Sequence, residues 1–248
     1  MWEVIVNRVK QGFRTLPYPK KVPLFPKRFR GKPVICGSRA QFTVEQEKDP
    51  LGALVLKERP GVDMGKLLFN EDIKASSSDG IFTYSQDHRM AVSKRQDLII
   101  CEDGVKLASA LNEKIRRIFG RSLKLRQVCA GSCNGCDCEI QAMGNVVFDF
   151  SRFGIQFTAS PRHADGLMIT GAVSKNMELA LNKTYEAVAS PKIVIAVGAC
   201  ALSGGPFQGG REVNNGVEGL FPVDLYIPGC PPHPLTILDG MLRLLGRL

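Results

Sequence analysis

The second half of the chain alternates apolar runs with segments of helical periodicity. Runs of consecutive apolar residues predict buried strands at 155–159, 166–170, 192–197 and 223–227. Apolar residues at helical spacing, or the stretches between strands, predict helices near 139–149, near 174–189 and over 234–248. This alternation is typical of a parallel sheet with short connections. We therefore expect an α/β fold, a flavodoxin-like parallel sheet, over residues 121–248.

The first half follows another pattern. Residues 34–100 carry short apolar runs between polar stretches, which predicts a small α+β module rich in loops. A helical pattern from Asp103, a candidate N-cap, to Phe119 predicts a connecting helix within 101–120, ended by Gly120. Residues 1–12 have the pattern of a short amphipathic helix.

Charge is concentrated at the start of the chain. The 248 residues have a net charge of +9, and nine basic residues against one acid lie in the first 32. Within 1–33 these basic residues alternate with prolines, which suits an extended arm on a partner protein or near anionic headgroups. We expect no nucleic-acid partner. No apolar stretch is long enough to span a membrane and none is typical of a secretory signal, so we expect an intracellular protein.

Eight cysteines suggest metal chemistry, because dense cysteines in an intracellular chain are seldom disulfides. Four of them crowd into CAGSCNGCDC, where Cys133 and Cys136 form a C-x2-C pair. Cys200 and Cys230 each follow an apolar run, so each is predicted just past the carboxyl end of a buried strand. Ligands bind at that edge of an open parallel sheet. These four thiolates could therefore meet there.

Three interpretations of the cysteines remain open on spacing alone. Four thiolates suit zinc or an iron–sulfur cluster, and ligands scattered around a glycine-rich loop favour [4Fe–4S] over zinc or metal-free thiols. Cys129, Cys133 and Cys136 also have the C-x3-C-x2-C spacing of radical-SAM enzymes, which would require a βα barrel. Cys36 and Cys101 are interpreted as small buried hydrophobic residues, a role also open to Cys129 and Cys138.

Four motifs then carry a family resemblance: GSCNGCDCEI, RFGIQFTASPRHADGLMITGAV, IAVGACALSGG and VDLYIPGCPPHP, in that order. Together they resemble the small subunit of [NiFe]-hydrogenases and the matching electron-transfer subunit of respiratory complex I. The resemblance implies one [4Fe–4S] cluster on Cys133, Cys136, Cys200 and Cys230, beside a large partner subunit. It also implies a proton path at Glu139 and a turn near the cluster formed by Arg162, His163 and Asp165.

Two further details refine the resemblance. C-N-G-C at the first motif is similar to membrane-bound, energy-converting hydrogenases such as formate hydrogenlyase. Residues 34–100 resemble a ferredoxin-like domain that has lost its cluster ligands. The positions of its two cysteine runs would be Leu67, Asn70, Ile73 and Ser77, and Arg39, Phe42, Glu45 and Asp49. None of these is a cysteine, so we expect no clusters there.

The predicted function is electron relay in a hydrogenase-like or complex I-like oxidoreductase, without catalysis by this chain alone. Expected partners are a large hydrogenase-like or complex I-like subunit and membrane-arm subunits reached through residues 1–33, with a quinone as a candidate acceptor of the complex. The expected location is peripheral, on the cytoplasmic side of the membrane. The alternatives are a scaffold subunit with zinc or no metal, and a radical-SAM-type enzyme.

Overall fold

The computed structural model describes residues 2–56, 58–70, 80–101, 104–111, 113–119 and 122–248. Its helices are α1 (Trp2–Gln11), α2 (Arg39–Gln46), α4 (Glu113–Phe119), α5 (Gly135–Ala142), α6 (Lys175–Ala187), α7 (Gly198–Ser203) and α8 (Pro234–Leu244). Its strands are β1 (Pro33–Ile35), β2 (Leu54–Leu56), β3 (Pro60–Asp63), β4 (Phe82–Tyr84), β5 (Ile99–Ile100), β6 (Leu123–Cys129), β7 (Ile155–Phe157), β8 (Gly166–Thr170), β9 (Ile193–Val197) and β10 (Leu225–Ile227). Within these ranges no helix has the length and apolar character to cross a membrane.

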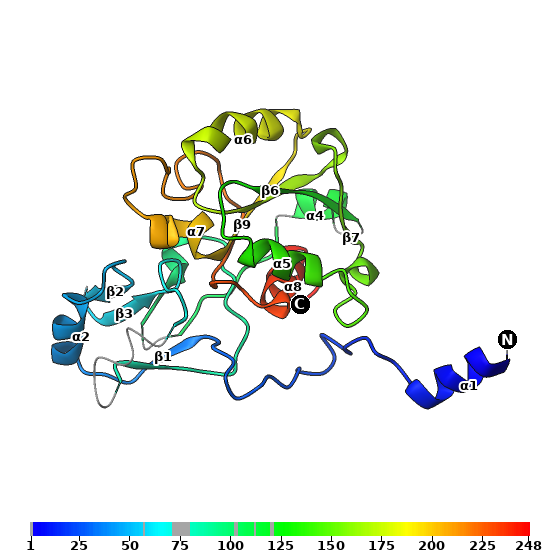
Figure 1. Ribbon diagram of the computed structural model, residues 1–248, viewed down its shortest axis with the longest axis horizontal. Helices are drawn as coiled ribbons and strands as arrows, with labels where there is room; N and C mark the ends of the chain where they lie inside the picture. The colour runs from blue at the N-terminus through cyan, green and yellow to red at the C-terminus, as the bar shows by residue number, and fades with distance from the viewer. Residues whose placement is uncertain (1, 57, 71–79, 102–103, 112, 120–121) are drawn as a thin grey trace.

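The centre of the molecule is an open, five-stranded parallel sheet in the order β10-β9-β8-β6-β7 (Figure 1). Counted along the chain, the order is 2-1-3-4-5, which is the flavodoxin-like order. The fold class expected for residues 121–248 is therefore confirmed. The strand order reverses between β6 and β8, and such a switch point is where open α/β sheets bind their ligands.

Side chains alternate between the two faces of the sheet, because successive residues of a strand point in opposite directions. In β8, Leu167 and Ile169 pack on one face while Met168 packs on the other. The first face is covered by α6 and by the region between α2 and β5, and the second by α5 and α8. Both faces are thus buried, which explains why β9 is apolar throughout and β8 is apolar up to Thr170 at its end.

Several predicted elements of this half are found. The strand predicted at 166–170 is β8 with the same bounds, and the helix predicted near 174–189 is the slightly shorter α6. The helix predicted near 139–149 is wrong in both bounds, because α5 begins directly after the cysteine loop at Gly135 and ends at Ala142. The Asn145 side chain then accepts hydrogen bonds from two following backbone N–H groups, which stabilises a turn in place of further helix.

The connecting helix predicted from Asp103 to Phe119 is mostly wrong. Among the described residues of this segment, only α4, at its end, is helical, while Asp103 and Gly120 lie outside them. The backbone N–H of Ala108 bonds Ala91 O at 2.8 Å and that of Leu111 bonds Leu244 O at 2.9 Å. These donors are used across the fold instead of along a helix, so the apolar spacing reflects packing in a non-helical segment.

The described residues of 34–100 form an α+β region of two small antiparallel sheets, β1-β4 and β2-β3-β5, with α2 beside them. Its apolar residues belong to the same core cluster as one face of the parallel sheet. Phe42 and Leu67, two of the former ligand positions of the expected ferredoxin-like framework, are fully buried in this core. Ile73 and Ser77 lie outside the described residues, and the ferredoxin-like origin stays a prediction.

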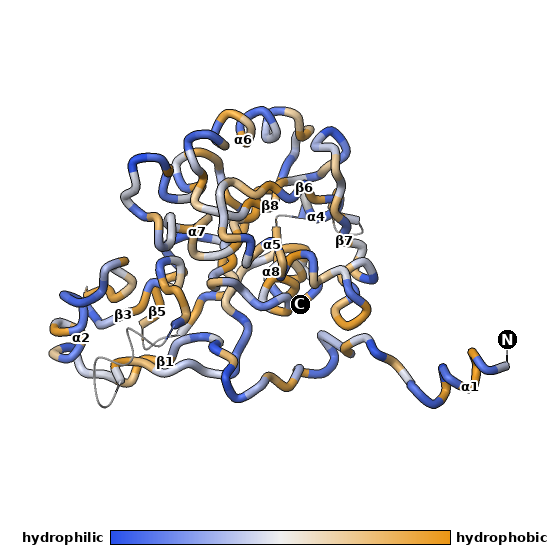
Figure 2. The backbone as a smooth tube through the Cα atoms, in the orientation of Figure 1, coloured by the Kyte–Doolittle hydropathy of each residue, from blue (hydrophilic) through white to orange (hydrophobic). Residues whose placement is uncertain are grey.

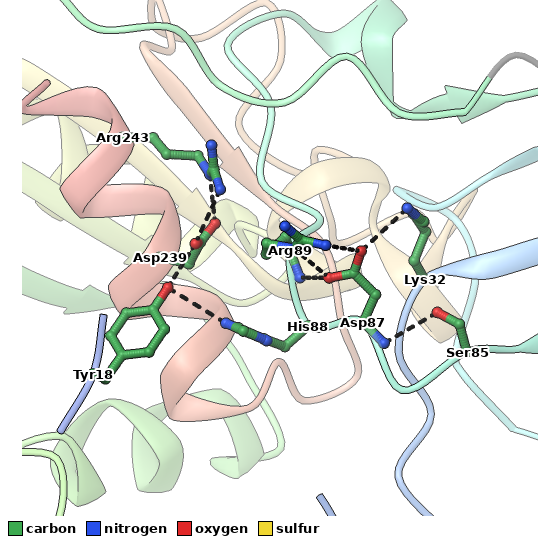
Figure 3. Close-up of polar contacts among 8 residues, drawn as sticks. All are labelled: Tyr18, Lys32, Ser85, Asp87, His88, Arg89, Asp239 and Arg243. Carbon is green, nitrogen blue, oxygen red and sulfur yellow. Dashed lines mark hydrogen bonds and ion pairs between the residues drawn. The ribbon is translucent and has the colours of Figure 1, made fainter. Parts of the chain in front are cut away.

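The basic arm is held along this chain's own surface from Thr15 onward. The Thr15 hydroxyl donates to Val146 O and the Leu16 N–H donates to Val147 O, both at 2.8 Å. Further along, the Tyr18 hydroxyl donates to Asp239 on α8 at 2.6 Å, and Arg243 donates to the same carboxylate at 2.7 Å (Figure 3). Residues 15–33 of the arm are called the strap below. The strap has an inner face on α8 and an outer face toward solvent.

Candidate metal centre

Three separate segments carry the four predicted ligand cysteines to one edge of the sheet. Cys133 and Cys136 lie in the loop after β6 and at the start of α5, Cys200 lies in α7 directly after β9, and Cys230 follows β10. Since these strands are parallel, their carboxyl ends share one edge. The first pair sits beside the switch point between β6 and β8.

The electrostatics of the thiols show that the four cysteines are neighbours. Burial raises the pKa of Cys136 first, and the nearby Cys200, Cys230 and Cys133 raise it further. Burial, followed by Cys230 and Cys133, raises the pKa of Cys200 to about 11. Without a cation, the thiols of Cys136 and Cys200 would thus stay protonated at neutral pH. A bound metal reverses that preference because it stabilises the thiolate.

Glycines make room for the cysteine sulfurs. A Cβ on Gly198 would lie 2.4 Å from the Cys136 Sγ, and one on Gly205 would lie 2.9 Å from the Cys200 Sγ. Both glycines have positive φ, +86° and +54°, a region that L side chains rarely adopt. The short segment around α7 can therefore approach two of the sulfurs closely. This is the physical reason for the small residues that surround Cys200.

A buried carboxylate fixes the cysteine loop to the sheet. Asp137, 4% exposed, accepts hydrogen bonds from Gln127 Nε2 at 2.7 Å, Thr170 Oγ1 at 2.8 Å and Ser132 Oγ at 2.7 Å. Burial alone would raise the pKa of Asp137, but these hydrogen bonds lower it below its ordinary value. The loop is thus anchored at a residue adjacent to Cys136.

The sequence motifs do not single out Asp137. Its position is the one signal for it, since an acid inside a C-D-C triplet at the start of a helix must find hydrogen-bonding partners if it is buried. Gln127 and Thr170 supply them from two adjacent strands, β6 and β8. Their contribution depends on the sheet order, which the sequence alone does not specify.

The other four cysteines are not among the thiols that raise the pKa of Cys136 or Cys200. Cys129 Sγ contacts Ser132 Oγ at 3.1 Å, and Cys138 Sγ accepts from Asn134 Nδ2 at 3.5 Å. The interpretation of Cys36 and Cys101 as buried hydrophobic residues is wrong, because Cys36 is exposed and Cys101 half-buried. Cys129 and Cys138 are exposed as well. Since the parallel sheet is open, it also lacks the barrel that the radical-SAM interpretation requires.

Glu139 borders a cavity of about 260 Å³ beside the cysteine site. Cys230 and His233 line the same cavity, together with Arg28 and Phe29 of the strap. Burial raises the pKa of Glu139, so its carboxyl takes up a proton more readily than an exposed glutamate does. The position suits a group that holds a proton near Cys230, and the role of Glu139 in a proton path stays a prediction.

The turn with Arg162, His163 and Asp165 lies at the opposite edge of the sheet. Asp165 accepts from the Lys124 N–H at 2.7 Å, at the amino ends of β6 and β8. Arg162 and His163 do not join the cysteine group, and His163 is exposed. The structure therefore does not bring this turn together with the four cysteines. Its observed role is to join strands β6 and β8. A role in tuning a cluster stays a prediction, and no observed contact links the turn to the four cysteines.

The donor set fits an iron–sulfur cluster, since four thiols from three segments lie at one sheet edge. Among the described residues, no three His, Cys, Asp or Glu side chains are arranged to hold one metal ion. Zinc requires its donors at about 2.0–2.3 Å from a single point. An iron–sulfur cluster is larger, and its thiolate ligands bind different irons. The four cysteines match such a cluster in the type and number of their ligands.

The fold and the site together define a flavodoxin-like α/β protein with a cysteine-lined ligand edge. Residues 133–244 match the family described as NADH ubiquinone oxidoreductase, 20 Kd subunit. The chain is 46% identical over 146 residues to an NADH-quinone oxidoreductase subunit of Phocaeicola vulgatus, and the match covers 58% of this chain and 72% of that protein. The chain belongs to this family.

Two relatives come from hydrogenase-related systems. The probable membrane-bound hydrogenase subunit mbhJ of Pyrococcus furiosus is 42% identical over 132 residues, covering 53% of this chain and 79% of that protein. Formate hydrogenlyase subunit 7 of Escherichia coli K12 is 41% identical over 151 residues, and the match covers 61% of this chain and 58% of that protein. The resemblance inferred from the four motifs is therefore confirmed for both branches.

Proposed function

We propose that this chain is the electron-relay subunit of a membrane-associated oxidoreductase and holds one [4Fe–4S] cluster on Cys133, Cys136, Cys200 and Cys230. The observation that carries the proposal is the meeting of three distant segments at one sheet edge, each bringing cysteine to the same place. Family membership supports it, since the relatives are subunits of quinone oxidoreductases and hydrogenases.

The chain's own residues prepare the site for such a group. When bound, the cluster supplies one-electron transfer, with a potential that depends on local charge, hydrogen bonds and exposure to water. Gly198 and Gly205 leave space at the sulfurs, and Asp137 anchors the loop that carries Cys133 and Cys136. Burial of Cys136 and Cys200 limits access of water. Glu139 is positioned to hold a proton on the Cys230 side.

The partners follow from the class of complex. A large hydrogenase-like or complex I-like subunit would cover the cysteine edge, with Glu139 facing a proton path toward it. A quinone is the candidate acceptor of the complex, and the chain would lie peripherally on the cytoplasmic side of the membrane. Residues 34–100 would act as a docking module without clusters, since Phe42 and Leu67 at former ligand positions are core residues.

Single cysteine-to-serine variants test the ligand set, with the remaining cysteines as matched controls. Serine in place of Cys136, Cys200 or Cys230 is expected to abolish most of the iron content of anaerobically purified protein. Serine in place of Cys36, Cys101 or Cys138 is expected to leave it unchanged, because these thiols lie outside the group. Iron and acid-labile sulfide per chain are the measurements.

The opposite pattern would reject the proposal. If Cys129→Ser removed the iron while Cys200→Ser and Cys230→Ser retained it, the radical-SAM set would hold the metal. If every variant and the parent chain carried zinc without iron, the chain would be a structural subunit.

A further inference from the structure

Helix α1 has an apolar face that packs against nothing in the described chain. At 3.6 residues per turn, Trp2, Ile5, Val6 and Val9 fall within an arc of about 100°. Trp2 is 74%, Ile5 50% and Val9 79% exposed, and the helix buries no residue. Apolar and polar residues alternate along the α1 tube in the hydropathy colouring (Figure 2). Such a face is unfavourable in water and calls for a covering surface.

Positive charge flanks this face on both sides. On the helical wheel, Arg8 lies beyond one border of the apolar arc and Lys10 beyond the other, and Glu3 is the one acid of the helix. Arg14 follows directly, and the outer face of the strap adds the exposed Lys20 and Lys21. Long basic side chains in this arrangement extend toward anionic groups while the apolar face is buried.

The geometry leaves α1 free to lie on an external surface. It projects away from the body of the molecule, at the opposite end from the α2 region (Figure 1). Gly12 joins it to the strap, with φ of +64° and open space where a side chain would begin. The strap is fixed from Thr15, so the helix is attached by a short connection. Val22 and Leu24 on the strap are 83% and 101% exposed and extend the apolar surface.

We propose that α1 lies in the headgroup region of an anionic lipid bilayer and holds this chain at the membrane. An apolar stripe that includes tryptophan, bordered by basic residues, is the pattern of a helix that lies in the membrane interface. An acidic protein groove would also attract the charges. The lipid surface is favoured because basic residues flank the stripe on both sides and continue along the strap. This inference does not depend on the cluster.

The sequence provides its own probe, because Trp2 is the one tryptophan of the chain. The full-length protein is mixed with vesicles of phosphatidylcholine alone or of phosphatidylcholine with phosphatidylglycerol, and bound protein is separated by flotation. We expect binding about tenfold or more stronger on the anionic vesicles, with a blue shift of Trp2 emission. Raising salt from about 0.1 M to about 1 M, which shortens the Debye length from about 10 Å to about 3 Å, should release it.

A matched pair of variants distinguishes vesicle binding through the apolar face of α1 from nonspecific adsorption. Val9→Gln removes an apolar group from the face, whereas Val4→Gln makes the same change on the opposite side of the helix. Both valines are highly exposed, at 79% and 71%, so neither change disturbs the core. We expect Val9→Gln to weaken vesicle binding several-fold and Val4→Gln to leave it unchanged.

Three results would overturn the inference. One is the absence of binding and of an emission shift on either vesicle, which would leave an acidic partner protein as the surface that covers α1. Another is equal binding to neutral and anionic vesicles. The third is an equal loss in Val4→Gln and Val9→Gln. Iron content, measured in the same samples, reports separately on the proposed cluster.

Discussion

At the scale of single residues, the site depends on groups that are small as much as on groups that react. Gly198 lies so close to the Cys136 Sγ that no side chain fits between them. Asp137 is not one of the four proposed ligands, and yet its hydrogen bonds anchor the loop that carries Cys133 and Cys136. Cysteine positions are apparent in a sequence, whereas close approach and hydrogen bonding depend on the fold.

Gly198→Ala is expected to prevent most iron incorporation. The new Cβ would lie 2.4 Å from the Cys136 Sγ, so either the sulfur or α7 must move. Gly209→Ala is the matched control, because Gly209 also has positive φ, +76°, and has nothing within 4 Å of a Cβ. Both variants carry the backbone cost of about 1–2 kcal/mol. Equal iron content per chain in the two variants would contradict the role of Gly198.

The half-buried His233 predicts a stability that falls as pH drops below neutral. Burial first, and His88 second, lowers the pKa of His233 to about 4, while an unfolded histidine titrates near 6.5. The unfolded chain therefore binds more protons between these values. Unfolding free energy should decrease by about 1–2 kcal/mol from pH 7 to pH 5 through this residue.

His233→Asn isolates this effect. Asparagine can keep the N-cap hydrogen bond that His233 Nδ1 accepts from Leu235 N, without the titration. Urea unfolding at pH 7 and pH 5 should show a smaller difference in this variant than in the parent chain. His163→Asn serves as control because His163 is exposed. An unchanged pH dependence in His233→Asn would show that the parent's loss comes from other groups.

At the scale of elements, apolar patterns predict the buried parts of the fold well. Strands β8 and β9 are covered on both faces, so their sequences are apolar runs with clear ends. The pattern does not predict strand β6, since Lys124, Arg126 and Gln127 interrupt its apolar residues. Arg126 and Gln127 line an open cavity beside the three-residue β7. A central strand with one incompletely covered face does not have the continuous apolar pattern of its neighbours.

For the strap, the sequence pattern predicts contact with a partner protein. The structure shows that the strap makes many of its contacts with its own chain. Phe25 and Phe29 stack at 4.1 Å and meet the His233 ring at 5.1 Å and 5.6 Å. Proline-rich segments have no internal hydrogen bonds, so composition does not reveal what they pack against. Here, the partner of the inner face is α8 and the loop that follows Cys230.

Tyr18→Phe should weaken the strap and lower the unfolding free energy by about 1.5–3 kcal/mol, the range for a hydrogen bond to a charged group. The variant removes the hydrogen bond that the Tyr18 hydroxyl donates to the carboxylate of Asp239, which is only 1% exposed. Tyr185→Phe is a matched control, because the observed contacts of Tyr185 side-chain atoms are made by its ring. Urea unfolding is the measurement, and equal values for the two variants would contradict the importance of the Tyr18 bond.

At the scale of the whole molecule, the two halves are not independent bodies. Apolar residues of the 34–100 region share one core cluster with the first face of the parallel sheet. Ser203, next to the cysteine edge, donates to Gly65 O at 2.9 Å across this boundary. The sequence pattern separates the halves and indicates the class of each. It does not show that one supports the α7 segment of the other.

A count of iron, acid-labile sulfide and zinc per chain in anaerobically purified protein, with an EPR spectrum after reduction, tests directly whether this chain holds one cluster. We expect about four irons, about four sulfides and one spin system, as for a single [4Fe–4S] cluster. About twelve irons would show that residues 34–100 kept two clusters. Zinc without iron would contradict the electron-relay function.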